Sequence, residues 1–195
     1  AVADEGWEAK AAGDVVTLAY PVGMEAEAVD VVRLERRPTV AEARKAGATL
    51  ARIAGGSPLT ILGETLPRLP QLLLGLSLRG YAFTDHKSDK GKAPAPAHVF
   101  CSKPDETEAA CKEALALAEG VFFTRDLVNE PANVLTTTEF ADRLVALRDL
   151  GVEVEVIEED RLAELGMNAM LCVGQGSSAP TKMVVMRWNG GSGDP

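Results

Sequence analysis

The sequence has 195 residues, of which 46% are hydrophobic and 25% are charged, as is typical of a globular protein with one large domain or two small ones. Its 20 lysines and arginines stand against 29 aspartates and glutamates, so the net charge is −9 at pH 7. Such a charge repels phosphate backbones and anionic lipid surfaces, and we therefore expect neither nucleic acid nor membrane among the partners.

The cysteines and the amino-terminal stretch favour a cytoplasmic protein. Cys101, Cys111 and Cys172 have no Cys-x-x-Cys spacing, and we interpret them as reduced, mostly buried thiols of a cytoplasmic protein. Residues 1–14 contain neither a basic start nor an apolar run, so no signal peptide is visible. The longest apolar stretch, at 72–78, is too short to span a bilayer.

The first third of the sequence predicts two strands and a helix. Runs rich in β-branched residues favour strands over residues 15–20 and 29–34. A helix follows, for which Thr39 and Glu42 form a capping box. Gly55 supplies the left-handed exit from this helix.

The next elements are a strand at residues 59–62 and an apolar helix from 69 to 80, with Pro70 in its first turn. Residues 84–97 are polar and rich in lysine and proline, which predicts an exposed loop. A strand is expected at residues 98–102.

A long helix is predicted from residue 104 to 128, with acidic residues in its first turns, where the helix dipole favours them. Pro131 lacks an amide proton and keeps Glu130 out of the helical region, so the helix must end at or near Asn129. The candidate buried positions of this helix are Ala110, Leu115, Ala118, Phe122 and Leu127.

The last third begins with a helix capped by Thr136 and Glu139 in a second capping box. Its apolar face would consist of Phe140, Leu144 and Leu147.

Strict alternation predicts a strand at 152–157, followed by a short helix that ends at Gly166. Residues 169–173 are apolar and ambiguous in type, and 182–188 predict a strand. Because strands and helices alternate along the chain, we expect an α/β fold with a mixed or mostly parallel sheet.

Residue chemistry alone predicts no catalytic, cofactor-binding or metal-binding residue. His86 and His98 are interpreted as a loop residue and a structural residue, since they lack a metal-ligand spacing. Residues 174–179 match the letters Gly-x-Gly-x-x-Ala, but a strand and not a helix should follow, which favours a glycine-rich turn. The acidic runs at 105–108 and 158–160 are interpreted as helix starts.

A resemblance to a known family adds to this picture. Residues 125–144, RDLVNEPANVLTTTEFADRL, are followed in order by VEVEVI, LAELGM, VGQGS and KMVVMRWNGG. Together with GYAFTDHKSDK upstream, this order of motifs resembles the cytosolic leucyl aminopeptidase family over residues 80–191. Before residue 80 only the α/β alternation is shared.

The resemblance implies three parts. Residues 1–103 would form an amino-terminal α/β domain that is incomplete at its start, and residues 104–128 a linker helix. Residues 129–195 would be the opening segment of the catalytic domain. The Asn-Glu-Pro turn would then mark the place where one domain leads into the next.

The resemblance also implies an activity and partners. Members of this family release amino-terminal residues from peptides with two divalent metal ions, zinc or manganese, and they typically assemble as homo-hexamers. Their metal ligands lie in glycine-rich stretches such as Gly-Lys-Gly and Asp-Ala-Glu-Gly, neither of which occurs in this sequence. We therefore expect the segment to be structural and oligomerising, to lack the metal ligands, and to have the remainder of the catalytic domain as its partner.

Two other readings stay open at this point. The first is a free-standing α/β binding module, for a nucleotide or a protein partner, without catalysis. The second is an enzyme with a site of its own inside this segment. A reading frame that continues into a Gly-Lys-Gly and an Asp-Ala-Glu-Gly stretch would favour the aminopeptidase.

Overall fold

The computed structural model describes residues 7, 9–91 and 95–191 of the chain. The chain divides into two compact units, Ala1–Arg125 and Asp126–Pro195. Parts of the amino-terminal stretch 1–14 and of the predicted loop 84–97 lie outside the described residues. Among the described residues, no helix combines the length and the apolar composition needed to cross a membrane.

The described residues of the first unit form a hairpin, a parallel strand pair and three helices, whose order along the chain follows the prediction from the sequence. The elements are β1 (Val15–Ala19), β2 (Ala28–Val32), α1 (Val40–Ala54), β3 (Leu59–Glu64), α2 (Leu69–Gly80), β4 (Ala97–Cys101) and α3 (Pro104–Asn129), of which α3 continues into the second unit.

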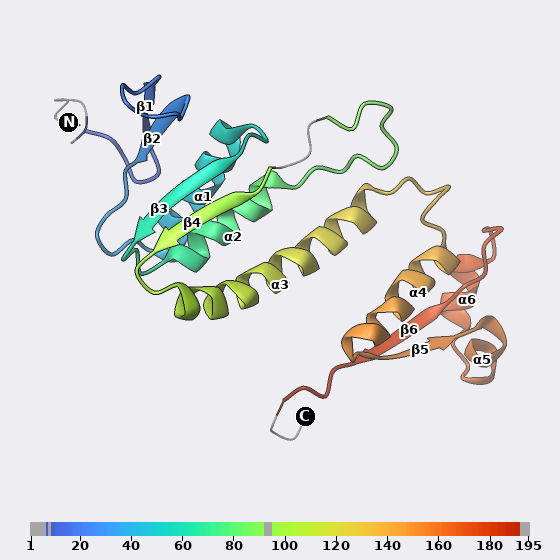
Figure 1. The fold of residues 1–195 in the computed structure, drawn as a ribbon. Helices are drawn as coiled ribbons and strands as arrows, with labels where there is room; N and C mark the ends of the chain where they lie inside the picture. The colour runs from blue at the N-terminus through green and yellow to red at the C-terminus, as the bar shows by residue number, and fades with distance from the viewer. Residues whose placement is uncertain (1–6, 8, 92–94, 192–195) are drawn as a thin grey trace. The chain divides into compact units, whose positions relative to one another are not determined.

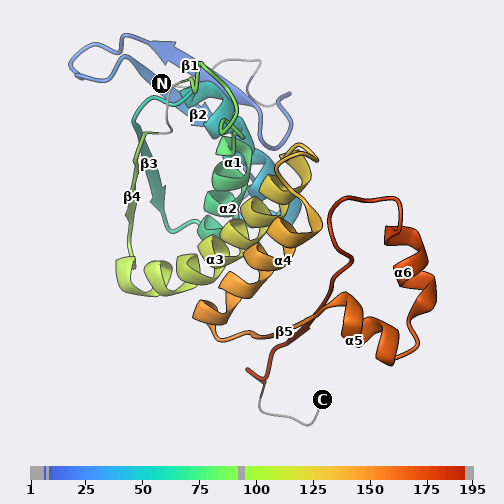
Figure 2. The ribbon, with the colours of Figure 1, turned by 90° about the vertical axis from the view of Figure 1, so that its right-hand side faces the viewer.

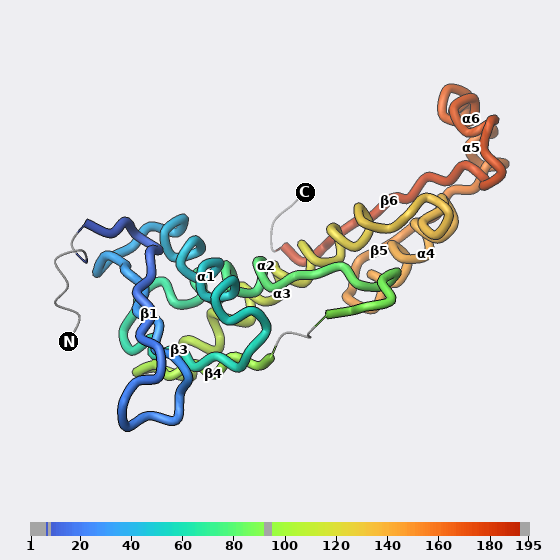
Figure 3. Tube along the Cα trace, turned by 90° about the horizontal axis from the view of Figure 1, so that it is seen from above, coloured from blue at the N-terminus to red at the C-terminus, as the bar shows by residue number. Residues whose placement is uncertain are grey.

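β3 and β4 pair in parallel, and α1 and α2 lie together on one side of this pair (Figure 1). β1 and β2 form a separate antiparallel hairpin, whose connecting loop extends beyond the strands (Figure 3). Figure 2 shows β4 leading through a short turn into α3. The core of the unit lies between the helices and the inner face of the strand pair, and its buried members are Ala43, Ala46, Leu50, Ile61, Leu69 and Leu72.

α1 and α2 cross at two glycines. A Cβ atom added to Gly47 would overlap the backbone carbonyl oxygen of Leu72 and lie 2.7 Å from the Leu76 nitrogen. A Cβ atom added to Gly75 would overlap the carbonyl oxygen of Arg44. The two backbones are therefore in direct contact, which only glycine permits at these positions.

The amino terminus of α1 forms the capping box that the sequence predicts. The Thr39 hydroxyl oxygen accepts a hydrogen bond from the Glu42 amide at 3.2 Å, and the Glu42 carboxylate accepts one from the Thr39 amide at 2.7 Å. The Thr39 hydroxyl also donates to that carboxylate at 2.9 Å. These bonds hold the pKa of the Glu42 carboxyl below its ordinary value of 4.5. Gly55 ends the helix at φ +55°, as expected.

Replacing Thr39 by alanine should lower the free energy of unfolding by about 1 kcal/mol at neutral pH, because one helix amide loses its acceptor. The folded pKa of Glu42 is lowered, so the contribution of its carboxylate is present above pH 4.5 and is lost as the pH falls through the folded value. The cost of the substitution should therefore shrink in acid. Urea unfolding at neutral and acidic pH measures this difference. Thr49→Ala is the control, since the Thr49 hydroxyl only donates back to the Lys45 carbonyl inside the helix.

α3 ends at Asn129, as predicted, but its buried face is narrower than expected. Of the five candidate positions only Ala118 is buried, whereas Ala110 and Leu115 are exposed. Phe122 is half-buried and stacks on Tyr81 with ring centroids 5.3 Å apart. Among the described residues of the first unit, no helix or strand packs along the length of α3, so an apolar period in the sequence overestimates burial here.

Over residues 126–191, the second unit forms one antiparallel strand pair, three α-helices and a 3₁₀ helix, besides the end of α3. The elements are α4 (Thr137–Val145), η1 (Ala146–Leu150), β5 (Glu153–Ile157), α5 (Glu159–Glu164), α6 (Asn168–Gly174) and β6 (Met183–Arg187). β5 and β6 run side by side with Glu153 opposite Arg187, and α4 contacts both strands. The ambiguous stretch 169–173 folds as helix α6.

The amino terminus and the apolar face of α4 differ in part from the prediction. Thr136 accepts a hydrogen bond from the Glu139 amide at 3.3 Å, but the Glu139 carboxylate accepts one from Arg143 Nε at 2.9 Å, so the capping box is only half formed. Leu144 is buried together with Ala141, while Phe140 is 42% exposed. The α-helix tightens into a 3₁₀ helix after Val145, and Leu147, the third predicted member of the face, is half-buried in it.

The α/β class is thus confirmed. The sheets are mixed, since β3 and β4 are parallel while β1–β2 and β5–β6 are antiparallel.

Candidate functional site

The Asn-Glu-Pro turn at the start of the second unit is built around a buried carboxylate. The carbonyl of Pro131 accepts hydrogen bonds from the amides of Val134 and Leu135, both at 2.9 Å, which closes the turn after α3. The Glu130 side chain is only 3% exposed, and its Oε1 accepts a hydrogen bond from Arg143 Nη2 at 2.8 Å. The turn is therefore fixed to α4 by a charge-assisted bond.

Arg143 also donates from Nε to Glu139, one helical turn earlier in α4. The hydrogen bonds to Glu130 and then to Glu139 raise the pKa of Arg143, so its guanidinium stays charged throughout the accessible pH range. The bonds of Arg143 to Glu130 and Glu139 thus hold the Asn-Glu-Pro turn against helix α4. Sequence reasoning identified Glu130 only as the residue before a proline, because the pairing with Arg143 spans 13 residues and leaves no local pattern.

The residues that directly follow the glycine-rich stretch 174–179 are hydrogen-bonded to the starts of α4 and α5. The Thr137 hydroxyl donates to the Pro180 carbonyl at 2.7 Å, and the Glu159 carboxylate accepts from the Thr181 amide at 2.7 Å. A Cβ atom on Gly174 would overlap the Thr181 hydroxyl oxygen, so α6 and the chain before β6 pack closely there. Because strand β6 follows the stretch, the helix required by a dinucleotide fingerprint does not follow it.

The remaining candidate ligands of the sequence lie apart. His86 lies in an exposed turn, where its ring is 5.7 Å from that of Phe83, and His98 is exposed on β4. The acidic runs fall in the first turns of α3 and α5, as expected from the helix dipole. Among residues 7, 9–91 and 95–191, no group of three or more His, Cys, Asp or Glu side chains could hold a metal ion.

The three cysteines are free thiols, but they are less buried than predicted. Cys101 and Cys111 are half-buried, whereas Cys172, in the short helix α6, is exposed. Burial raises the pKa of the Cys111 thiol, and the nearby Cys101 adds to this.

We expect Cys172 to be alkylated by iodoacetamide before Cys111, since reaction needs an accessible thiolate. Mass spectrometry of peptides from a short labelling time course at neutral pH measures the order. Equal rates at the two cysteines in the folded chain, or faster labelling of Cys111, would contradict the burial described here.

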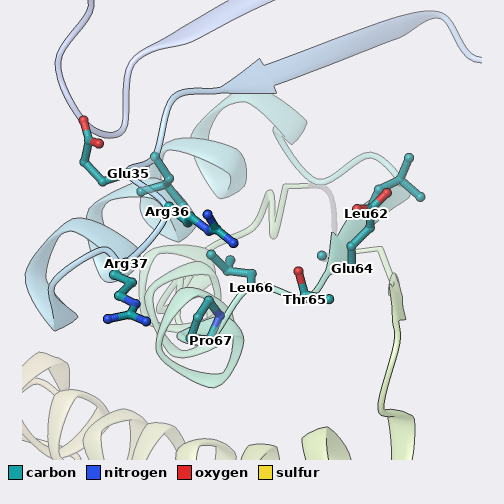
Figure 4. Close-up of a pocket in the computed structure, with 10 residues that line it drawn as sticks. Glu35, Arg36, Arg37, Leu62, Glu64, Thr65, Leu66 and Pro67 are labelled. Atoms are coloured by element: carbon teal, nitrogen blue, oxygen red, sulfur yellow. The ribbon is translucent and has the colours of Figure 1, made fainter.

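A pocket of about 480 Å³ lies in the first unit, between the chain before α1 and the chain before α2 (Figure 4). Its walls are residues 34–37 and residues 62–67. Arg68 Nε donates to the Pro38 carbonyl at 3.3 Å, which joins the starts of the two helices next to the pocket.

One wall of this pocket contains a β-bulge. Leu62 pairs with Phe100 and Glu64 pairs with Cys101, so the pairing skips Gly63. Glu64 has φ +38°, a left-handed conformation that costs free energy for a residue with a side chain. Its carbonyl accepts hydrogen bonds from the Ser102 amide at 2.9 Å and the Ser102 hydroxyl at 3.1 Å, which hold this conformation in place.

Comparison with known proteins locates the second unit within a family. The model of the cytosol aminopeptidase family, catalytic domain, matches residues 122–195. A probable cytosol aminopeptidase of Dinoroseobacter shibae is 51% identical over 191 residues, which are 98% of this chain and 39% of the relative. Its counterpart in Cereibacter sphaeroides is 46% identical over 194 residues, which are 100% of this chain and 40% of the relative. The chain thus spans about two fifths of the length of these curated relatives.

Two solved structures are similar to this chain in fold. The bottromycin maturation enzyme BotP in complex with Mn has a TM-score of 0.71 at 29% identity and covers 90% of this chain, which corresponds to 39% of that protein. A tomato leucine aminopeptidase mutant has a TM-score of 0.75 at 20% identity, with 90% and 38% covered, and this likeness shows the fold alone. With identity to curated cytosol aminopeptidases along its whole length and the catalytic-domain match at residues 122–195, the chain belongs to the cytosol aminopeptidase family.

Proposed function

We propose that the chain is the amino-terminal portion of a leucyl aminopeptidase that removes amino-terminal residues from peptides. The observation that carries the proposal is the identity of 51% to a probable cytosol aminopeptidase over 98% of the chain. In such an enzyme, two divalent metal ions supply an activated water and an anchor for the free amine of the substrate.

Within this enzyme the chain would be a scaffold. Residues 1–103 form the amino-terminal α/β domain, residues 104–128 the linker helix, and residues 129–195 the opening segment of the catalytic domain. The Glu130–Arg143 pair would fix the direction in which the chain enters the catalytic domain. The remainder of the catalytic domain would be the immediate partner and peptides the substrates of the whole enzyme.

The metal ligands would come from the rest of the enzyme, and zinc or manganese would be the metal. The manganese in the BotP complex supports a divalent ion of this kind. We further propose that the enzyme is cytoplasmic and assembles as a homo-oligomer, a hexamer by family resemblance, to which the first unit contributes contact surface.

Two assays on the purified 195-residue chain test the scaffold role. We expect no stoichiometric zinc or manganese after metal loading and dialysis, and no hydrolysis of leucine p-nitroanilide. A retained metal together with turnover would show that the segment has a site of its own.

A chimera tests the aminopeptidase itself. In the Dinoroseobacter shibae relative, the aligned 191 residues are replaced by those of this chain, and the rest of the relative is kept. If the chain is the matching scaffold, the chimera should fold and hydrolyse leucine p-nitroanilide in the presence of manganese. If the chain is a separate binding module, the chimera should be inactive while the relative itself is active.

A further inference from the structure

The pocket of the first unit is lined by charged, polar and apolar groups, and the polar part of its surface is larger than the apolar part. Leu34, Leu62, Leu66 and Pro67 supply the apolar part of the lining. Two arginines and two glutamates supply the charges, so the formal charge of the lining is zero. Its volume of about 480 Å³ suits a small molecule, since such pockets are typically about 300–1,000 Å³.

The four charged residues are not equivalent. The guanidinium of Arg36 points into the space between the two walls, whereas the side chains of Arg37 and Glu35 point away from it (Figure 4). Glu35 also lies 3.8 Å from Arg33, which partly neutralises it. Glu64 belongs to the opposite wall, at the end of β3. Arg36 points into the pocket and Glu64 lines its opposite wall, beside Leu62, so these two residues are the charges that we assign to ligand binding.

The wall that bears Glu64 is held in a strained form. The bulge at Gly63 and the left-handed φ of Glu64 cost free energy, and the two hydrogen bonds from Ser102 to the Glu64 carbonyl maintain them. Bulges of this kind re-aim a side chain relative to the regular strand. Here the strand ends with Leu62 76% exposed and Glu64 beside the pocket, an arrangement that has no evident packing benefit.

The charge pattern selects among ligand chemistries. A phosphate or another multiply charged anion would be attracted by Arg36 but repelled by Glu64. A cation would meet the reverse situation. A molecule that bears both a carboxylate and an ammonium group can satisfy both walls, and an apolar side chain on it can contact the leucine and proline side chains of the lining.

We propose that this pocket binds a zwitterion, namely a free amino acid or short peptide with an apolar side chain, through its carboxylate at Arg36 and its ammonium at Glu64. Such molecules are the products and substrates of an aminopeptidase, so a role in sensing product concentration rests on the proposed function. Binding itself does not, because it needs only the first unit of this chain.

The test is a titration of the ¹⁵N-labelled chain with L-leucine and with L-leucyl-L-leucine into the millimolar range, followed by amide chemical shifts. Both charged groups are exposed, and we expect millimolar dissociation constants with shifts confined to residues 34–37 and 62–67. The tighter of the two ligands identifies the length of the natural one. If the isolated chain gives a poorly dispersed spectrum, the same titration is made on the chimera.

Blocked ligands and matched variants decide the assignment. N-acetylleucine and leucinamide each lack one charge and should bind about tenfold more weakly than leucine. Arg36→Gln and Glu64→Gln should weaken leucine binding to a similar degree, while Arg37→Gln and Glu35→Gln should leave it within twofold.

Two outcomes would overturn the proposal. One is a folded protein whose pocket amides show no chemical-shift change at the highest leucine concentration of the titration. The other is equal binding of leucine, N-acetylleucine and inorganic phosphate, which would show a general anion site at Arg36. Neither outcome bears on the aminopeptidase activity of the chimera, so the two proposals fail separately.

Discussion

Gly47→Ala and Gly75→Ala should each destabilise the first unit by about 3 kcal/mol or more, a large part of the roughly 5–15 kcal/mol by which an ordinary domain is stable. Each new methyl group would enter the backbone of the facing helix, at Leu72 in one case and at Arg44 in the other. Neither backbone can yield without separating α1 from α2. These helices and the inner face of β3 supply the core, so their separation opens the whole unit.

Urea unfolding followed by far-ultraviolet circular dichroism measures this effect. Gly120→Ala is the matched control, because Gly120 lies inside helix α3 and an added Cβ would meet nothing within 4 Å. That control should be neutral or stabilise by about 0.5–1 kcal/mol, since alanine favours helix. If Gly47→Ala behaved like Gly120→Ala, the close helix crossing described here would be wrong.

Arg143→Ala should produce the largest loss of stability among charge substitutions in the second unit. Removing the guanidinium takes a charged donor away from the Glu130 carboxylate, which is 3% exposed. The free-energy cost of burying this carboxylate remains, while the attraction to Arg143 that offsets it is lost. The pKa of Arg143 is raised by its hydrogen bonds to Glu130 and Glu139, so its contribution is present at neutral pH and is lost only as the pH rises through the raised value, in strongly alkaline solution. The effect should therefore be full at neutral pH.

Thermal unfolding of paired variants separates this pair from an ordinary surface pair. Arg161→Ala removes an exposed partner of Glu164 and should change the free energy of unfolding by no more than about 0.5 kcal/mol. The double substitution Arg143→Met with Glu130→Met should recover much of the stability lost by Arg143→Ala, since it leaves no buried charge behind. Equal melting temperatures for Arg143→Ala and Arg161→Ala would contradict the role assigned to Glu130.

Local signals in the sequence were sufficient for the order of elements. Thr39, Gly55 and Pro131 act through hydrogen bonds or backbone angles within a few residues, and each marks a helix end as predicted. The buried face of α3 was overestimated because burial depends on which elements pack against a helix, and this information is not contained in its own period.

The residues that form sites could not be found in the same way. Glu130 and Arg143 pair across 13 residues, and the two walls of the pocket are separated by α1 in the sequence. Neither arrangement has a characteristic spacing. Likewise, the alternation at β5 predicted a strand but could not show that its neighbour β6 runs antiparallel to it.

The rate at which the chimera hydrolyses leucine p-nitroanilide with manganese tests the central claim most directly. If this chain is the amino-terminal scaffold of a cytosol aminopeptidase, the chimera should reach a kcat/KM within about tenfold of the parent enzyme, because every metal ligand comes from the parent. A folded chimera that binds manganese but shows no hydrolysis, beside an active parent, would contradict the claim.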